Sequence, residues 1–467
     1  MKKLIKFYYC LLYLAPAVLF FSYYPIISLG QTESMNLELS LPLIWLVIFD
    51  ILSFIILLSL SKDIHKKFAG ISDRKFFLSS LFPLYATLSI FWSANTLRAI
   101  LTAGILWLLF FAIFSVIFIQ KNLPEPQKFP QTLLKSIFLS TAVICVWCWL
   151  QCILDLFNLN QSTTLLCDGC IYEMFGFPHP NGFAIEPQFM GNLLLAPTIL
   201  AGYLLLSTKS HRKSLVCLFA FFATTLFLTF SRGAIYSFIL ALATLIIIFI
   251  IKQKTAKPLL LCLVAVISFL FTLNAQGLMS QFSYTNDTYL TGVTKSLDQL
   301  TLGIFGLTAN NSSENSTEPS ESPAITETTT IESTFDGYVE ESTNVRLNLT
   351  NIALTAWSQG GANIILFGTG LGGAGIYLQE NGFLDFSKEI IQNQYASLLL
   401  ETGLVGVIIL LILGCIVIKA ILKNQHKPLY FALILAYACS LLFFAGLPNA
   451  LHIYLMPAII SKSKSVI

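Results

Sequence analysis

Residues Ser214–Ile251 read SLVCLFAFFATTLFLTF-SRG-AIYSFILALATLIIIFII, which is two long apolar runs separated by only three residues. A helix crosses a bilayer with about twenty mostly apolar residues. The pattern therefore predicts two antiparallel membrane helices joined by a short turn at Ser231-Arg232-Gly233. Arg232 would then lie at the membrane edge, where a charge is costly and is usually paired or functional.

Comparable apolar runs recur along the whole chain. They cover approximately residues 8–29, 40–60, 76–93, 97–120, 133–157, 187–206, 214–230, 234–251, 257–275, 396–418 and 429–446. A shorter run at 450–461 contains Pro457 and predicts a kinked or partial span. The chain is 56% hydrophobic and only 11% charged, whereas soluble domains carry about 25% charged residues. We therefore predict an all-α integral membrane protein with about twelve (11–12) transmembrane helices.

The basic residues determine the predicted orientation, because cytoplasmic loops of membrane proteins collect Lys and Arg. If the N-terminus is cytoplasmic and the spans alternate, 22 of the 27 basic residues lie on the cytoplasmic side. We expect a multi-pass protein of the cytoplasmic (inner) membrane with both termini in the cytoplasm.

This topology divides the chain into three parts. Residues 1–275 hold transmembrane helices 1–9, residues 276–392 form a large extracytoplasmic loop, and residues 393–467 hold helices 10–12. Within the loop, residues 308–344 are rich in Ser, Thr, Asn and Glu and contain no Lys or Arg, so we expect them to be disordered. In residues 344–358, the spacing of Arg346, Thr350, Leu354 and Trp357 puts these four side chains on one helical face and so predicts a helix.

Three arginines are candidates for binding phosphate at the outer face, namely Arg98, Arg232 and Arg346. The planar guanidinium group matches phosphate oxygens through paired hydrogen bonds. If the three side chains converge, they can hold a diphosphate. The alternative is that they extend to the membrane interface or form structural ion pairs.

The candidate acids on the outer side are Glu186, Asp385, Glu389 and Glu401. Glu186 comes directly before a predicted helix, where a carboxylate also complements the positive end of the helix dipole. A solvated surface explains Asp385 and Glu389, and Glu401 can simply pair with an arginine. His179, between two prolines, is more typical of a packed loop histidine than of a catalytic base.

Two further motifs carry little functional weight. Phe367–Gly375 (FGTGLGGAG) has dinucleotide-loop spacing, but no βαβ pattern surrounds it and it lacks the ending of a P-loop, so it predicts a tight turn. Cys167 and Cys170 leave open a local disulfide or two free thiols, because a zinc site would need two more ligands. We expect neither a cofactor nor a metal.

Four short segments with an outer-face location stand in a fixed order: Leu88–Ser93 (LSIFWS), Ser231–Gly233 (SRG), Arg346 with Trp357 and Phe367–Gly370 (FGTG), and Gln392–Tyr395 (QNQY) with Leu400–Gly406 (LETGLVG). They resemble the LS-x-x-WS, SRG, R…W…GxG and HNxY…LExGxxG motifs of the O-antigen ligase and O-antigen polymerase superfamily of polytopic glycosyltransferases. The long outer loop before the last helices also fits that family.

The resemblance implies a GT-C-like helical bundle and a glycan donor linked to polyprenyl diphosphate (undecaprenyl diphosphate or a similar carrier). A hydroxyl of a glycan or lipid acceptor would attack the anomeric carbon, as in polysaccharide biosynthesis for the cell envelope. The implied site residues are Arg98, Arg232 and Arg346 for the diphosphate, Glu186, Asp385, Gln392 and Asn393 for catalysis, and Tyr395 and Glu401 in support.

Gln392 departs from the pattern of the family that this chain resembles, because ligases of that family carry a histidine at this position. Glutamine cannot act as a general base. We therefore favour a polymerase, which joins lipid-linked units, over a ligase, which moves a finished glycan to a lipid or protein acceptor. The alternative from another class is a transporter of polysaccharide or lipid-linked sugar, which predicts charged or broken helices at mid-membrane and often a repeated half.

Overall fold

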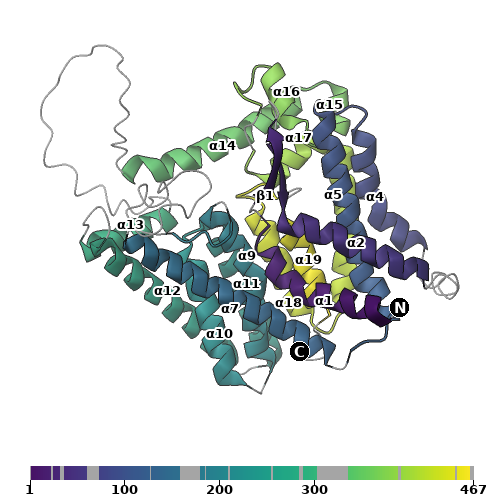
Figure 1. Ribbon diagram of the computed structural model, residues 1–467. Helices are drawn as coiled ribbons and strands as arrows, with labels where there is room; N and C mark the ends of the chain where they lie inside the picture. Colours follow the sequence, from purple (N-terminus) through teal and green to yellow (C-terminus); the bar gives the residue numbers. More distant parts are fainter. Residues whose placement is uncertain are drawn as a thin grey trace, which may run out of the picture.

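The computed structural model describes residues 2–22, 25–31, 36–59, 73–126, 128–157, 179–184, 186–208, 211–253, 256–282, 288–301, 335–387, 391–446 and 450–462. These residues form a helical bundle with one small hairpin (Figure 1). The elements are α1 (Lys2–Leu19), β1 (Pro25–Gln31), β2 (Asn36–Ser40), α2 (Leu41–Ser59), α4 (Asp73–Ser89), α5 (Thr96–Phe114), the π-helix η1 (Ser115–Ile119), α6 (Gln120–Asn122), α7 (Phe129–Leu156), α9 (Pro187–Ser207), α10 (Arg212–Leu228), α11 (Arg232–Gln253), α12 (Lys257–Gln281), α13 (Tyr289–Thr301), α14 (Phe335–Gln359), α15 (Ala362–Phe367), α16 (Ala374–Glu380), α17 (Gln394–Leu422), α18 (Lys427–Ser440) and α19 (Leu451–Ile460).

Seven helices in the described part of the chain are long and apolar enough to cross a membrane. They are Leu41–Ser59, Thr96–Ile119, Phe129–Leu154, Pro187–Ser207, Arg232–Ile251, Lys257–Gln281 and Gln394–Leu422. Three shorter apolar helices, Phe76–Ser89, Lys427–Ser440 and Leu451–Ile460, occupy further predicted runs. The chain is thus a largely helical membrane protein, and the number of 11–12 spans stays a prediction.

The first predicted run, residues 8–29, is wrong at its C-terminal end. Helix α1 ends at Leu19, and strand β1 pairs antiparallel with β2. Pro25 has no backbone N–H and cannot continue a helix, and the β-branched Ile26 and Ile27 favour an extended strand. A short apolar run fits a helix or a strand equally well, which is why periodicity alone missed the hairpin.

Helix α9 lies at the centre of the bundle. Every residue from Met190 to Leu206 is buried, and the helix packs against α7, α10, α11, α12 and α18. A helix that is apolar on all sides is expected in the interior. Because Glu186 directly precedes α9, the central helix carries this carboxylate at its N-terminal end.

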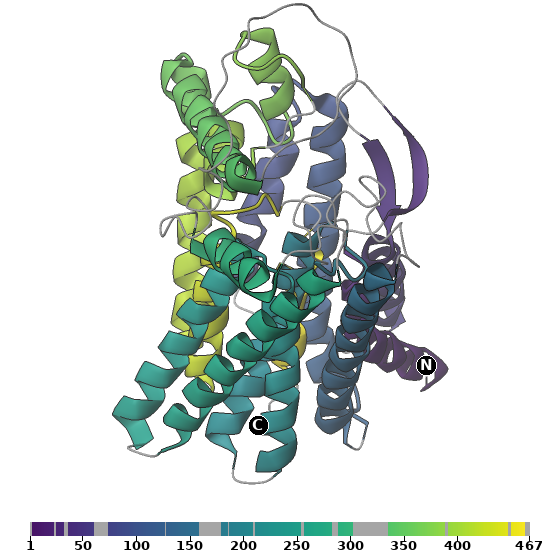
Figure 2. The same cartoon turned by 90° about the vertical axis from the view of Figure 1, so that its left-hand side faces the viewer.

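Helices α14, α15 and α16 lie at one end of the bundle (Figures 1 and 2). The predicted helix over residues 344–358 is confirmed as the second part of α14. Helix α14 begins at Phe335, inside the stretch 308–344 for which we expect disorder. Residues 302–334, Cys167, Cys170 and Glu389 lie outside the described residues.

Candidate active site

The N-terminal ends of α9 and α11 pack closely against each other. Gly191 on α9 makes this possible, because a Cβ there would come within 2.9 Å of the Ser231 Cβ and 2.7 Å of the Ala234 Cβ. The Ser231 hydroxyl donates to the backbone oxygen of Gln188 at 3.5 Å. The turn that joins the two helices is formed by Thr229–Ser231, two residues earlier than predicted, because α10 ends at Leu228 and α11 begins at Arg232. Arg232 is therefore the first residue of α11, and it lies beside the start of α9.

The N-terminal end of α17 joins the same group through the segment that follows α18. The backbone N–H of Gln394 donates to the Leu441 oxygen at 2.9 Å, and its side-chain oxygen accepts from the Gly446 N–H. Within this segment Phe443 lies against Gly233, where a Cβ would come within 2.7 Å of the Phe443 Cβ. Three helix N-termini, each with a partial positive charge, thus gather at one end of the bundle.

Glu186 and Arg346 interact across this end. They come from the start of α9 and from α14, and both side chains are half-buried. Burial raises the pKa of Glu186 above its ordinary value, while the charge of Arg346 and a hydrogen bond from the Gln188 side chain act in the opposite direction. The structure thus brings together one predicted catalytic acid and one predicted phosphate-binding arginine, and Glu186 is an acid whose proton affinity is raised.

Gln392 and Asn393 have different roles at the start of α17. The Asn393 side-chain oxygen accepts from the backbone N–H groups of Tyr395 and Ala396 at 3.0 and 3.2 Å, so it caps the helix. The Gln392 side-chain oxygen is buried and has no hydrogen-bond partner in the described part of the chain. Tyr395 donates to the Ala438 oxygen at 2.7 Å and ties α17 to α18. Of these residues, Gln392 has the side-chain oxygen that could still accept a hydrogen bond from a substrate.

Arg98 and Glu401 form a separate group at the start of α5. The Glu401 carboxylate accepts hydrogen bonds from the backbone N–H groups of Gly372 and Ala374, and it lies within electrostatic range of Arg98. A Cβ on Gly372 would come within 2.6 Å of the Arg98 Cγ. This arrangement favours the structural ion-pair interpretation of both residues over direct contact with a diphosphate.

The glycine-rich segment Phe367–Gly375 is a tight turn, as predicted. Gly370 has a φ of 83°, which favours glycine, and a Cβ there would come within 2.5 Å of the Ser93 Cα. The Gly370 N–H donates to the Glu401 backbone oxygen at 3.0 Å. The turn therefore locks the segment before α5 to α17.

Helix α17 is broken next to this turn. Gly403 has φ 58° and ψ −167°, which is not helical. The Tyr85 hydroxyl bridges the break, since it lies 2.8 Å from the Phe367 oxygen and 2.7 Å from the Thr402 oxygen. The segment Gln394–Thr402 is thereby oriented independently of the rest of α17, which fixes the position of Gln392 and Asn393.

Asp385 is not brought into this group by any contact that the structure shows. Its side chain is exposed, and its backbone oxygen accepts from the Gln379 side chain at 3.2 Å. His179 is buried and packs on Phe230 with ring centroids 5.2 Å apart. Burial lowers the pKa of His179 to about 3, which confirms the prediction of a packed loop histidine.

Gln151 and Asp50 are among the buried polar residues that the sequence reasoning missed. Gln151 on α7 donates to the Asn181 side chain at 3.0 Å and accepts from the Gly182 N–H at 2.8 Å, so it holds the loop before α9. Asp50 is buried within α2. Their signal in the sequence is a polar residue inside an apolar run, which in a membrane helix is usually functional or structural.

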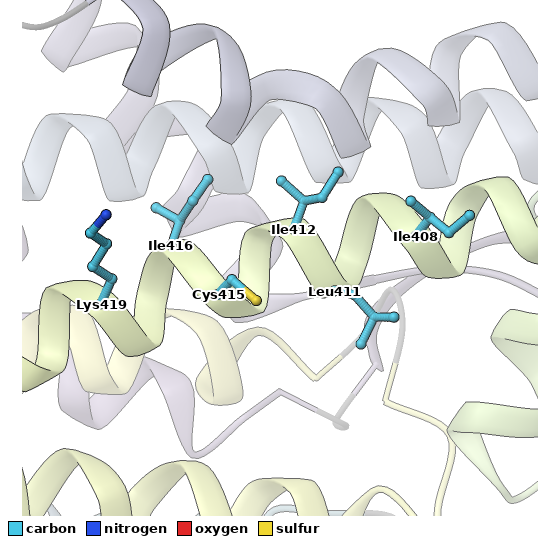
Figure 3. A pocket seen from close by; sticks show the side chains of 6 residues that line it. All are labelled: Ile408, Leu411, Ile412, Cys415, Ile416 and Lys419. Carbon is cyan, nitrogen blue, oxygen red and sulfur yellow. The ribbon is translucent and has the colours of Figure 1, made fainter.

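The described residues contain no group of three or more His, Cys, Asp or Glu side chains that could hold a metal ion. A groove of about 410 Å³ lies along one face of α17 and is lined by Ile408, Leu411, Ile412, Cys415, Ile416 and Lys419 (Figure 3). This apolar face is distinct from the polar group at the helix start.

Residues 217–411 match the model of a family described as O-Antigen ligase. The matched region runs from α10 into α17 and contains Arg232, Arg346 and Gln392, whereas Arg98 and Glu186 precede it. A search of curated proteins gave no match to the chain.

Proposed function

We propose that this chain is a membrane glycosyltransferase that joins glycan units carried on a polyprenyl diphosphate. The match of residues 217–411 to the O-antigen ligase family supports this proposal. The observation that carries the proposal is the interaction of Glu186 with Arg346 at the end of the bundle where α9, α11 and α17 begin. In the proposed topology this end faces away from the cytoplasm, on the outer side of the inner membrane.

Arg346 and Arg232 bind the diphosphate in this proposal. An acceptor hydroxyl attacks the anomeric carbon of the donor, the bond from that carbon to the phosphate oxygen breaks, and its electron pair leaves with the diphosphate. Negative charge grows on the leaving group, and positioned guanidinium groups stabilise it most strongly where water is largely excluded. Both arginines are half-buried, and the adjacent helix N-termini add positive potential.

Glu186 accepts the proton of the attacking hydroxyl. A general base works best when its pKa is near the working pH, and burial moves the pKa of Glu186 upward in that direction. Asp385, the other acid that we considered for this role, is exposed and lies in the turn after α16. We therefore assign the base to Glu186.

Gln392 positions the acceptor. Its buried side-chain oxygen has no partner in the described part of the chain, and a buried polar group without a hydrogen bond is unfavourable. A neighbouring hydroxyl of the acceptor sugar would donate that hydrogen bond, and the attacking hydroxyl would then be held near Glu186 with its own proton directed at the carboxylate. An amide in this position keeps orientation without proton transfer, which fits a polymerase better than a histidine-dependent ligase.

A deletion strain tests the proposal. We expect single lipid-linked glycan units to accumulate and the ladder of chain lengths to disappear, and plasmid-borne wild-type protein to restore the ladder. Full-length chains that remain on the polyprenyl carrier and fail to reach the surface would instead identify a ligase. Normal chains that reach the surface in the deletion strain would contradict any transferase role in this glycan.

A further inference from the structure

Asp50 lies in the middle of α2, a helix that can cross the membrane. Its side chain is 5% exposed. Neither carboxylate oxygen has a hydrogen-bond partner in the part of the chain that the structure describes. An ionisable residue inside a membrane helix is costly and usually pairs with another group or binds a ligand. The proposed transfer site does not use Asp50, so this carboxylate needs a separate explanation.

Two buried serines near Asp50 behave unusually for this protein. Helical serines here commonly donate to a backbone oxygen three or four residues earlier, as Ser59 does to Ile55 at 2.8 Å and Ser80 to Phe77 at 2.9 Å. Ser53 on α2 and Ser115 at the start of η1 are fully buried, yet neither hydroxyl has a partner among the described residues. Both hydroxyl oxygens are therefore available to coordinate a ligand such as a cation.

Packing places these residues in one region of the bundle. Tyr8 of α1 stacks on Phe49, next to Asp50, with ring centroids 5.1 Å apart, and its hydroxyl donates to the Ser115 backbone oxygen at 3.0 Å. Helix α2 also contacts α5 and η1 directly. Asp50 and Ser53 are three residues apart and so share one helix face. Short π-helices, such as the one that begins at Ser115, frequently occur at functional sites.

We propose that Asp50, Ser53 and Ser115 form a binding site for one sodium ion inside the membrane part of the protein. A single monovalent cation neutralises the one carboxylate, whereas a divalent ion would leave an excess positive charge in a medium of low polarity. Carboxylate and hydroxyl oxygens are hard ligands that suit hard cations. A proton on Asp50 would also remove the charge, and the response of the protein to NaCl distinguishes that state from a bound sodium ion.

Thermal unfolding of the full-length protein in detergent tests this site independently of glycan transfer. At constant ionic strength, replacing choline chloride with NaCl should raise the Tm progressively, because a ligand that binds only the folded state stabilises it by mass action. The isosteric, uncharged variant Asp50→Asn should show no response to NaCl. Ser115→Ala should need several-fold more NaCl for the same rise in Tm.

Ser268→Ala is the matched control, because Ser268 is a buried serine on α12 that donates to the Ala220 oxygen. This variant should keep the wild-type response. Binding of radioactive ²²Na⁺ to wild-type protein, displaced by unlabelled NaCl, provides a second readout if Asp50→Asn fails to fold. A wild-type Tm that is equal in NaCl and choline chloride, together with no displaceable ²²Na⁺, would overturn the proposal, as would equal responses of wild type and Asp50→Asn.

Discussion

Replacing Arg346 with Ala should both slow glycan transfer and move its pH dependence. The guanidinium group is assigned to the leaving diphosphate, and removal of one such donor from an enzyme site costs about 10²–10³-fold in rate. Arg346 also lowers the pKa of Glu186. Its loss should therefore raise that pKa further.

The direction of the pH effect follows from the charges. The positive charge of Arg346 favours the ionised carboxylate of Glu186 and so lowers its pKa. The base must be deprotonated to act, so activity falls as the pH drops through the pKa of Glu186. In Arg346→Ala this fall should begin at a higher pH than in the wild type.

The assay is the initial rate of polyprenyl diphosphate release by purified protein across the pH range, normalised to the amount of folded protein. Arg346→Lys is the control, because it keeps the charge and lacks the planar fork. It should be slow and yet retain a pH profile near that of the wild type. A wild-type rate in Arg346→Ala would refute the diphosphate role, and an unmoved acid limb would refute the coupling to Glu186.

Three other changes test the rest of the site. Gly370→Ala should lower the Tm by several degrees, because the residue has a φ of 83° and the added Cβ would meet the Ser93 backbone. Gly414→Ala is the control and should leave the Tm near the wild-type value, because nothing lies within 4 Å of its new Cβ. Equal Tm values for the two variants would contradict the role of Gly370 in the turn. Gln392→Ala should reduce transfer by about 5–10-fold with an unchanged pH profile, since one hydrogen bond and no proton transfer is lost; complete inactivation would show that we have assigned Gln392 too small a role. In a background without native cysteines, Asn381→Cys should react with a membrane-impermeant thiol reagent in intact cells and Gln425→Cys should not; the reverse pattern would invert the proposed orientation.

The helices could be predicted because long apolar runs have few alternatives in a membrane protein. The apolar run at residues 8–29 wrongly predicted a helix beyond Leu19. Hydrophobicity alone does not distinguish the end of that helix from the strand of the hairpin that follows it. Asp50 was also missed, because a single acidic residue hardly changes the mean hydropathy of an otherwise apolar run. This residue is the buried charge within a helix that the transporter alternative requires.

The site could be predicted in its parts and not in its pairing. Motifs drew attention to Arg98, Glu401, Glu186 and Arg346, but any of the arginines could have met any of the acids. The pairing depends on how α14 and the Gly370 turn fold over the bundle, which is a long-range packing outcome. The structure connects Glu186 to Arg346 and Glu401 to Arg98, and so separates a candidate reaction centre from a structural connection.

Reconstituted transfer with purified protein is the direct test of whether this protein polymerises lipid-linked glycan. Purified protein is incubated with a polyprenyl diphosphate-linked repeat unit, and the products are separated by the length of the glycan and by its attachment to lipid. We predict chains of increasing length on the carrier with release of polyprenyl diphosphate, and loss of both in Arg232→Ala and Arg346→Ala variants that retain the wild-type Tm. The proposed transferase function would be contradicted if folded wild-type protein moved the lipid-linked unit across a liposome membrane and left the glycan–diphosphate bond intact.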